Sequence, residues 1–161
     1  MATVDGVKVL PDAHGVIQGN GGLVDKLAGG AGTDRLEGHA TFNQYYGDGG
    51  NDTFILADKF AVAGGAHNGQ STVFGDQTTY ITDFHGAGTS TGEQDFVAFQ
   101  DYVPGTLQLD HTGTSGTPGA VLYYYTVDDI HGNTNNLIIN SLNGNALAQG
   151  DFAFVGFTTP V

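Results

Sequence analysis

The sequence contains no cysteine and only four basic residues, and each shortage excludes a class of function. Without cysteine there are no disulfides and no thiolate metal sites, so a small secreted domain needs another stabilising element, such as bound metal. The four Lys and Arg form no cluster that could neutralise phosphates, which disfavours binding to nucleic acid or to an anionic membrane. No apolar run approaches the ~18 residues of a membrane span.

Glycine and acidic residues, in contrast, are abundant. The 161 residues include 27 glycines, well above the usual share of about 7%. Seventeen Asp and Glu give a formal net charge of −13, and such a chain repels itself when compact unless its carboxylates find cations. The composition predicts an acidic protein that binds divalent metal, with acidity for solubility alone as the open alternative. The length predicts a single domain over residues 1–161.

Residues 20–55 consist of four consecutive nine-residue blocks, NGGLVDKLA, GGAGTDRLE, GHATFNQYY and GDGGNDTFI. The second block fits the pattern G-G-x-G-x-D-x-U-x at every defined position, and the fourth departs from it only at Asp48. The sixth positions bear oxygen and the eighth are apolar: Asp25, Asp34, Asn43 and Asp52, then Leu27, Leu36, Tyr45 and Phe54. An inserted residue near Gly22 offsets an earlier partial block, in which Ile17 takes the apolar position.

Each block predicts a Gly-rich turn followed by a three-residue strand, so that two blocks complete one coil and blocks two apart stack. Glycine permits the positive φ and the close backbone approach that such turns need. Calcium takes about 6–8 oxygen ligands, and two stacked turns can supply them together. Because the eighth-position side chains are the only core of these coils, and ordering each residue costs about 1–2 kcal/mol, we expect the coils to need metal.

After residue 60 the period disappears and short alternating segments follow, separated by Gly, Asn, Thr and Asp clusters. The predicted strands are 71–74, 79–84, 95–99, 105–110, 120–127, 136–142 and 151–157. A helical period is weak, with its best candidate at residues 57–63. The predicted fold is all-β: a short parallel β-roll at about 15–60, followed by a C-terminal β-sandwich-like capping region at about 61–161.

GGAGTDRLE and GDGGNDTFI resemble the hemolysin-type calcium-binding repeat of repeats-in-toxin (RTX) proteins. The segments ITDF (81–84), GEQDFVAF (92–99), GAVLYYY (119–125), NLIIN (136–140) and DFAFV (151–155) are similar to the C-terminal domain of serralysin-like proteases and other type I secreted proteins. The resemblance implies several bound Ca²⁺ ions, a type I secretion apparatus as partner, and a place outside a bacterium or on its surface.

The resemblance also implies metal ligands, which are backbone carbonyls and aspartates of paired turns. The first implied site consists of Gly30, Gly32, Asp34, Gly47, Gly49 and Asp52. A weaker one at the opposite edge, with less glycine and one neutral amide, consists of Gly21, Leu23, Asp25, Gly38, Ala40 and Asn43. A further calcium is implied at Asp83 and Asp95, for which turn capping is the open alternative because residues 85–94 are inserted between them.

Catalytic motifs are nearly absent from the sequence. Residues 88–92 spell G-x-S-x-G around Ser90, but the α/β pattern that this motif requires is missing. The H-E-x-x-H of a metalloprotease does not occur, and the six histidines lack zinc-like spacing. Turn chemistry accounts for Asp128 and Asp129 better than an acid pair does. We therefore expect no enzyme activity from this chain.

The leading functional expectation is an extracellular module that stays unfolded at low calcium, folds when calcium binds, and supports type I secretion of itself or of a parent protein. The rival is a calcium-dependent module that binds polysaccharide or assembles on a cell surface. Tyr123, Tyr124 and Tyr125 alternate between the faces of one strand, so one of them could stack on a sugar ring. Packing within the sheet is the ordinary alternative for all three.

Overall fold

The structure, a computed structural model, describes residues 2–11, 15–20, 22–38, 40–57, 77–86, 93–130 and 132–155. Gly21, Ser90, the expected strand at 71–74 and the candidate helix beyond residue 57 lie outside these residues. Within the described part of the chain, no helix is long and apolar enough to cross a membrane.

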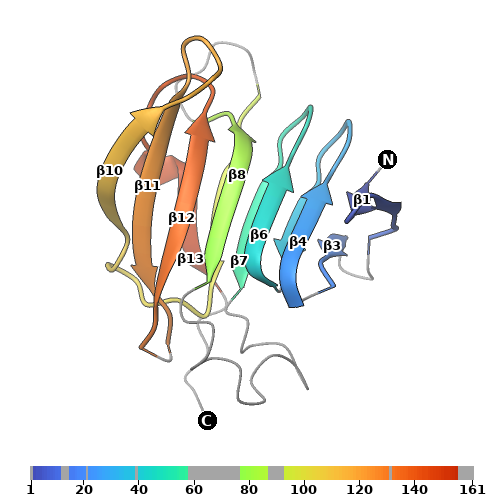
Figure 1. The fold of residues 1–161 in the computed structure, drawn as a ribbon, viewed down its shortest axis with the longest axis horizontal. Coiled ribbons are helices and arrows are strands. Elements are labelled where there is room, and N and C mark those ends of the chain that lie inside the picture. Colours follow the sequence, from blue (N-terminus) through green and yellow to red (C-terminus); the bar gives the residue numbers. More distant parts are fainter. Residues whose placement is uncertain are drawn as a thin grey trace.

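Two β-sheets make up the described fold, which confirms the all-β prediction and the parallel pairing of its repeat strands (Figure 1). The eight-stranded sheet has the order β10 (Gln108–Thr114), β11 (Val121–Asp128), β12 (Thr134–Ser141), β8 (Thr78–Phe84), β6 (Ala40–Tyr46), β4 (Gly22–Ala28), β1 (Thr3–Val4) and β2 (Val7–Lys8). The five-stranded sheet has the order β13 (Phe152–Val155), β9 (Phe96–Gln100), β7 (Thr53–Ala57), β5 (Arg35–Gly38) and β3 (Val16–Gln18). A short 3₁₀ helix, η2 (Gln149–Asp151), precedes β13.

From β3 to β9 the chain alternates between the two sheets, and each strand pairs in parallel with the strand two steps later. Leu36 lies opposite Phe54 in one sheet, and Leu27 lies opposite Tyr45 in the other. The eighth positions of blocks two apart are therefore neighbours, as their spacing predicts. Ile17 lies opposite Leu36, which confirms the one-residue offset expected near Gly22.

The core lies between the two sheets. The eighth-position residues Leu27, Leu36, Tyr45 and Phe54 are completely buried, and the rings of Tyr45 and Phe54 stack with their centroids 5.8 Å apart. The same cluster continues into the C-terminal strands through Val97, Phe99, Tyr125, Val127, Leu137 and Ile139. One continuous apolar core therefore joins the repeat strands to the strands that follow them.

Tyr45 carries the one phenol in the stacked column of eighth-position residues, and its hydroxyl has two partners. It accepts a hydrogen bond from Gly38 N at 2.7 Å and donates one to Ile55 O at 2.8 Å. Burial is the largest cause that raises the pKa of Tyr45 above its ordinary value, so the group stays neutral.

We expect Tyr45→Phe to lower the free energy of unfolding by about 1–3 kcal/mol, because the buried Gly38 N–H loses its acceptor. Urea denaturation of the folded protein measures the change. Tyr46→Phe is the matched control, since its half-buried hydroxyl contacts only a side chain, that of Gln44, among the hydrogen bonds identified for it. An equal loss in both variants would contradict the assignment.

Strands β4 and β6 are each seven residues long, where the repeat predicts three. Their blocks have Leu23, Val24, Thr41 and Phe42 near the positions at which the intact blocks carry glycine. Large and β-branched side chains favour extended backbone, so the strands extend through the degraded turns. The intact turns at 29–34 and 47–52 contain no strand residues. Among the described residues, Gly-rich stacked turns are consequently found at one edge of the repeat region only.

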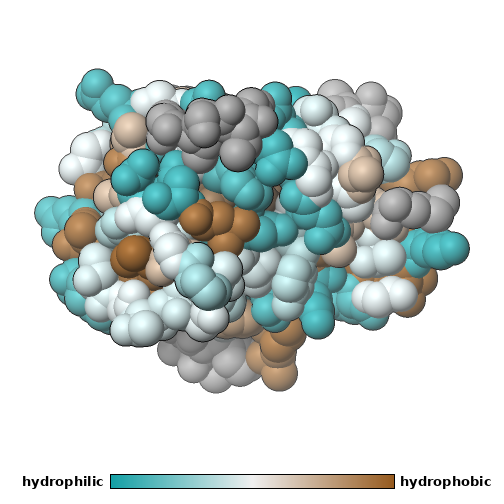
Figure 2. All heavy atoms as spheres, turned by 90° about the horizontal axis from the view of Figure 1, so that it is seen from above, coloured by the Kyte–Doolittle hydropathy of each residue, from teal (hydrophilic) through white to brown (hydrophobic). Residues whose placement is uncertain are grey.

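The strands after the repeats extend both sheets (Figure 1). β10, β11 and β12 form an antiparallel meander, and β12 then pairs in parallel with β8. β13 pairs in parallel with β9 in the other sheet. The described strands confirm the segments expected near 79–84, 95–99, 120–127 and 136–142. At the opposite end, where β1 lies, hydrophobic atoms reach the surface (Figure 2), and Val7, Leu10, Leu23 and Val24 are exposed.

Candidate metal centre

The two intact Gly-rich turns, residues 29–34 and 47–52, stack on each other. Gly32 N donates a hydrogen bond to Gly49 O at 2.9 Å, and Thr53 N donates one to Asp34 O at 2.8 Å. Gly32 and Gly50 both have a φ of 115°, which L side chains rarely adopt. A Cβ atom at Gly50 would also overlap the carbonyl group of Gly32. The backbone conformation therefore requires glycine at both positions, and the close approach of the turns requires it at Gly50 as well.

Three aspartates form a ladder along the stacked turns. Asp34 N donates to Asp52 Oδ1 at 2.9 Å, and Asp52 N donates to Asp95 Oδ1 at 2.9 Å. The register places Phe54 opposite Val97, so Asp95 precedes β9 as Asp52 precedes β7. The carboxylates of Asp52 and Asp95 thus each bind the backbone of the preceding aspartate with one oxygen, which leaves the other oxygen for a different partner.

The second oxygens of Asp34 and Asp52 are buried, and neither has a hydrogen-bond partner in the described part of the chain. Each folds back over a glycine five residues earlier: a Cβ at Gly29 would lie 2.6 Å from Asp34 Oδ2, and one at Gly47 would lie 2.5 Å from Asp52 Oδ2. An unpaired buried acceptor costs about 1–3 kcal/mol, and more if it is charged. These two oxygens are therefore where a cation would stabilise the fold most.

The pKa of Asp52 is raised to about 7, and burial is the largest cause. The hydrogen bond from Asp34 N lowers this pKa, and the nearby carboxylates of Asp95, Asp34 and Asp83 contribute to raising it. Burial is also the largest cause that raises the pKa of Asp34, Asp83 and Asp95. The turns thus collect several acidic groups whose charged forms disfavour one another. A bound divalent cation would reverse that balance.

Asp83 and Asp95 both lie at the end of the stack formed by the second turn. Asp83 accepts hydrogen bonds from Gly47 N at 2.9 Å and from Asp48 N at 2.8 Å. Asp95 accepts one from His85 N at 2.8 Å in addition to the one from Asp52 N. The structure therefore brings the two aspartates to the same turn and gives both of them turn-capping hydrogen bonds.

His85 and Glu93 join this cluster, and the sequence pattern alone did not identify them. His85 lies between two carboxylates, with Nε2 3.4 Å from Glu93 Oε2 and Nδ1 3.5 Å from Asp95 Oδ2. Glu93 Oε1 accepts a hydrogen bond from Gly50 N at 3.0 Å. Neither residue occupies a repeat position, so the period carries no signal for them. The acidic run before the strand at 95–99 is the only hint that the sequence contains.

The residues at the stacked turns fit a hard, oxygen-binding cation. The implied ligands are carbonyls of Gly30, Gly32, Gly47 and Gly49 with the carboxylates of Asp34 and Asp52, and calcium favours such a set. Among the described residues, no group of three or more His, Asp and Glu side chains is placed to hold a metal ion. Any cation here would accordingly depend on backbone carbonyls as well as on the two aspartates.

Asp48 differs from the repeat pattern, and its carboxylate has a local use. Asp48 has a φ of 66°, and its Oδ2 accepts a hydrogen bond from Gly30 N at 3.3 Å. The side chain thus links the second turn to the first at the position where the pattern has glycine. Asx residues tolerate this left-handed backbone better than other non-glycine residues.

The opposite edge of the repeat region has a different arrangement. Asn43 is fully buried, and its amide closes on Ala40: Ala40 N donates to Asn43 Oδ1 at 3.0 Å, and Asn43 Nδ2 donates to Ala40 O at 3.1 Å. Asp25 is also buried and accepts a hydrogen bond from Asn20 N at 3.0 Å. Leu23 lies within β4 and is exposed, Gly38 N donates to the Tyr45 hydroxyl, and Gly21 lies outside the described residues. The Asn43 amide thus supplies both an acceptor for Ala40 N and a donor for Ala40 O, whereas a carboxylate would supply only the acceptor.

Asp129 and two of the three consecutive tyrosines have structural partners. Asp129 Oδ1 accepts a hydrogen bond from Asn133 N at 2.9 Å, as turn chemistry predicts. Tyr123 donates its hydroxyl to Gly144 O, and the Tyr125 hydroxyl accepts from Leu147 N. Tyr124 points to the outer face of the eight-stranded sheet, where its ring stacks on His111.

Comparison with known proteins identified no relative of this chain. No protein-family model, no curated protein and no solved structure matches the chain.

Proposed function

We propose that this chain is a calcium-binding module of the RTX type, which folds outside a bacterium when calcium binds and supports type I secretion of itself or of a parent protein. In this proposal residues of about 15–60 form a parallel β-roll, and residues of about 61–161 form a β-sandwich-like cap. The proposal assigns the chain no catalytic role.

The observation that carries the proposal is the pair of buried, unpartnered oxygens on Asp34 and Asp52 at the stacked glycine turns. Buried polar groups are nearly always hydrogen-bonded, so two unpaired carboxylate oxygens on stacked turns favour a cation as their partner. Both oxygens belong to sixth-position aspartates of the two best-preserved blocks. The repeat pattern and the unsatisfied atoms thus indicate the same position.

Charge supplies the second support. The net charge of −13 opposes compaction. Burial is the largest cause that raises the pKa values of Asp34, Asp52, Asp83 and Asp95, and neighbouring carboxylates add to it. Bound calcium would supply positive charge and join two turns. Because the turns are far apart along an unfolded chain, the free energy of calcium binding would appear as free energy of folding.

A calcium titration of chelator-treated protein tests the proposal. We expect far-UV circular dichroism to show a cooperative gain of β structure, with calorimetry giving saturable binding over the same calcium range. Magnesium at equal concentration is the matched control, and it should be much less effective because it requires octahedral geometry and dehydrates reluctantly. A chelated protein that is already folded, and that calcium leaves unchanged, would rule the proposal out.

A further inference from the structure

A groove on the outer face of the eight-stranded sheet has no part in the calcium proposal. Strand register aligns His111, Tyr124, Ile138, Tyr80, Gln44 and Lys26 in one row across β10, β11, β12, β8, β6 and β4. The residues next to them in these strands, such as Tyr125 and Leu137, are buried in the core. The row therefore faces away from the core.

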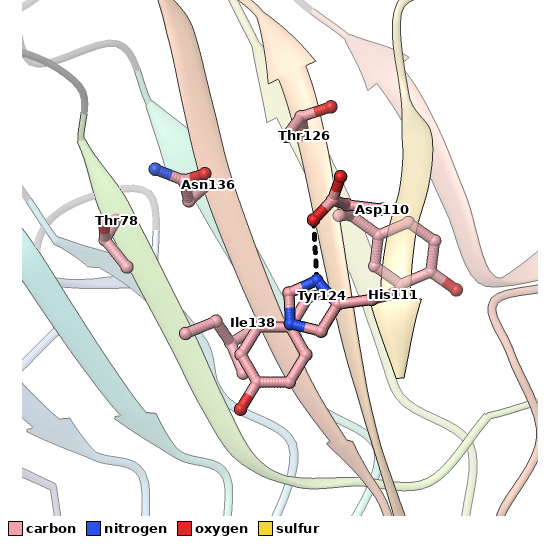
Figure 3. A pocket seen from close by; sticks show the side chains of 8 residues that line it. Thr78, Asp110, His111, Tyr124, Thr126, Asn136 and Ile138 are labelled. Atoms are coloured by element: carbon pink, nitrogen blue, oxygen red, sulfur yellow. Dashed lines mark hydrogen bonds and ion pairs between the residues drawn. The ribbon is translucent and has the colours of Figure 1, made fainter. Parts of the chain in front are cut away.

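A second row lies beside the first and carries short polar side chains. Thr126, Asn136 and Thr78 lie opposite one another on β11, β12 and β8. A cavity of about 200 Å³ is bounded by these three residues together with His111, Tyr124 and Ile138 (Figure 3). The groove thus combines hydroxyl and amide groups on one side with aromatic and apolar surface on the other.

The aromatic side of the groove is held in place by its neighbours. The imidazole of His111 stacks on the ring of Tyr124, with centroids 4.1 Å apart and planes 11° from parallel. Asp110 Oδ2 lies 2.6 Å from His111 Nδ1, as the dashed line in Figure 3 shows. This contact and the stack on Tyr124 both favour one orientation of the imidazole, which reduces the entropy cost of binding.

We propose that this groove binds one sugar unit of an uncharged polysaccharide. Sugar rings present both C–H surface, which packs on aromatic rings, and hydroxyls, which pair with Thr and Asn side chains. Pockets that orient small ligands have this mixture of apolar lining and a few polar groups. Among the lining residues, Asp110 is the only carboxylate, and none is Lys or Arg. The net charge of −13 also repels anionic polymers. The charge balance therefore favours a neutral glycan.

The small volume predicts weak binding, with a dissociation constant on the order of 1 mM for a single site. Affinity for a long glycan would rise if several copies of the module bound one polymer. The inference does not depend on the proposed calcium function, because the groove is formed by β8, β10, β11 and β12, which lie outside the repeats. Of these strands, β8 pairs with the repeat strand β6.

The test is an NMR titration of the folded, calcium-supplemented protein with cellohexaose, mannohexaose and xylohexaose, and with polygalacturonate as the anionic comparison. We expect saturable amide shifts on β8, β10, β11 and β12 with at least one neutral sugar and none with the anionic polymer. Tyr124→Ala and the more exposed His111→Ala should each weaken binding at least tenfold. Phe96→Ala, which removes an aromatic ring from the five-stranded sheet, should leave the affinity unchanged.

Three results would overturn the inference. They are the absence of saturable shifts with all three neutral sugars, shifts that survive both His111→Ala and Tyr124→Ala, and concentration-dependent self-association through the same strands in sedimentation experiments. The last result would assign the face to a second copy of this chain. Circular dichroism checks that each variant is folded. If Tyr124→Ala does not fold, His111→Ala alone tests the inference.

Discussion

Asp52→Ala should raise the calcium concentration at the folding midpoint at least tenfold. Asp34→Ala should raise it by a smaller factor. Each change removes a charged oxygen pair from the stacked turns, and a hydrogen bond or ion contact to a charged group contributes about 1.5–3 kcal/mol. A difference of about 1.4 kcal/mol is already tenfold in an equilibrium constant. Asp52 has the larger effect because its carboxylate also accepts a hydrogen bond from Asp34 N.

The calcium dependence distinguishes a ligand from an ordinary structural residue. The stability cost of Asp52→Ala should increase with calcium concentration, because at low calcium the change also relieves repulsion among acidic groups. Asp110→Ala is the matched control, because that side chain is 63% exposed and lies in β10, outside the turns. Equal losses for Asp52→Ala just above the folding midpoint and at saturating calcium would show that these aspartates stabilise the fold only through hydrogen bonds.

Acidification from pH 7 to pH 5 should weaken calcium binding by up to about tenfold per pH unit for each proton that calcium must displace. The ordinary pKa of an aspartate is 3.8, and that of Asp52 in the metal-free fold is about 7, chiefly because the group is buried. Calcium binds the deprotonated carboxylate, so its affinity rises with pH until Asp52 has lost its proton.

The stability of the metal-free fold should show the opposite slope, so acid should favour folding of the chelated chain. Its fold holds a proton on Asp52 more tightly than the unfolded chain does, so that contribution to stability is complete below about pH 4 and is lost as the pH rises through about 7. Titration calorimetry across this pH range measures the slope of the calcium affinity, and thermal denaturation of the chelated protein measures the slope of its stability. Both measurements are repeated with Asp52→Asn. If the variant keeps the wild-type pH dependence of calcium affinity, another group is responsible.

The repeat region could be predicted from the sequence because its period constrains two properties at once. Apolar eighth positions place Leu36 and Phe54 in the core, and oxygen-bearing sixth positions place Asp34 and Asp52 at the turns. The pairing of blocks two apart then follows from the alternation between sheets. Even the displaced partial block could be placed, because Ile17 repeats the apolar position after a single inserted residue.

The remainder of the fold depends on contacts that no short pattern encodes. The seven-residue strands β4 and β6 follow from degraded turns, but their extent depends on pairing with neighbouring strands. His85 and Glu93 reach the turns through tertiary packing, and Asn43 forms its own closed pair with Ala40. The groove beside Tyr124 arises from four strands that are aligned only in the folded sheet.

The aspartate ladder has rungs of unequal span, and this affects how the chain can vary in length. Asp34 and Asp52 are 18 residues apart, whereas Asp52 and Asp95 are 43 residues apart. Loop-closure entropy grows only with the logarithm of loop length, so the longer span adds about 0.8 kcal/mol relative to the shorter one. Lengthening the connection between β7 and β8 is therefore thermodynamically inexpensive, whereas an insertion within β5, β6, β7 or β8 would break the register of its sheet. The connection between β7 and β8 is thus the natural place to graft an additional segment into this protein.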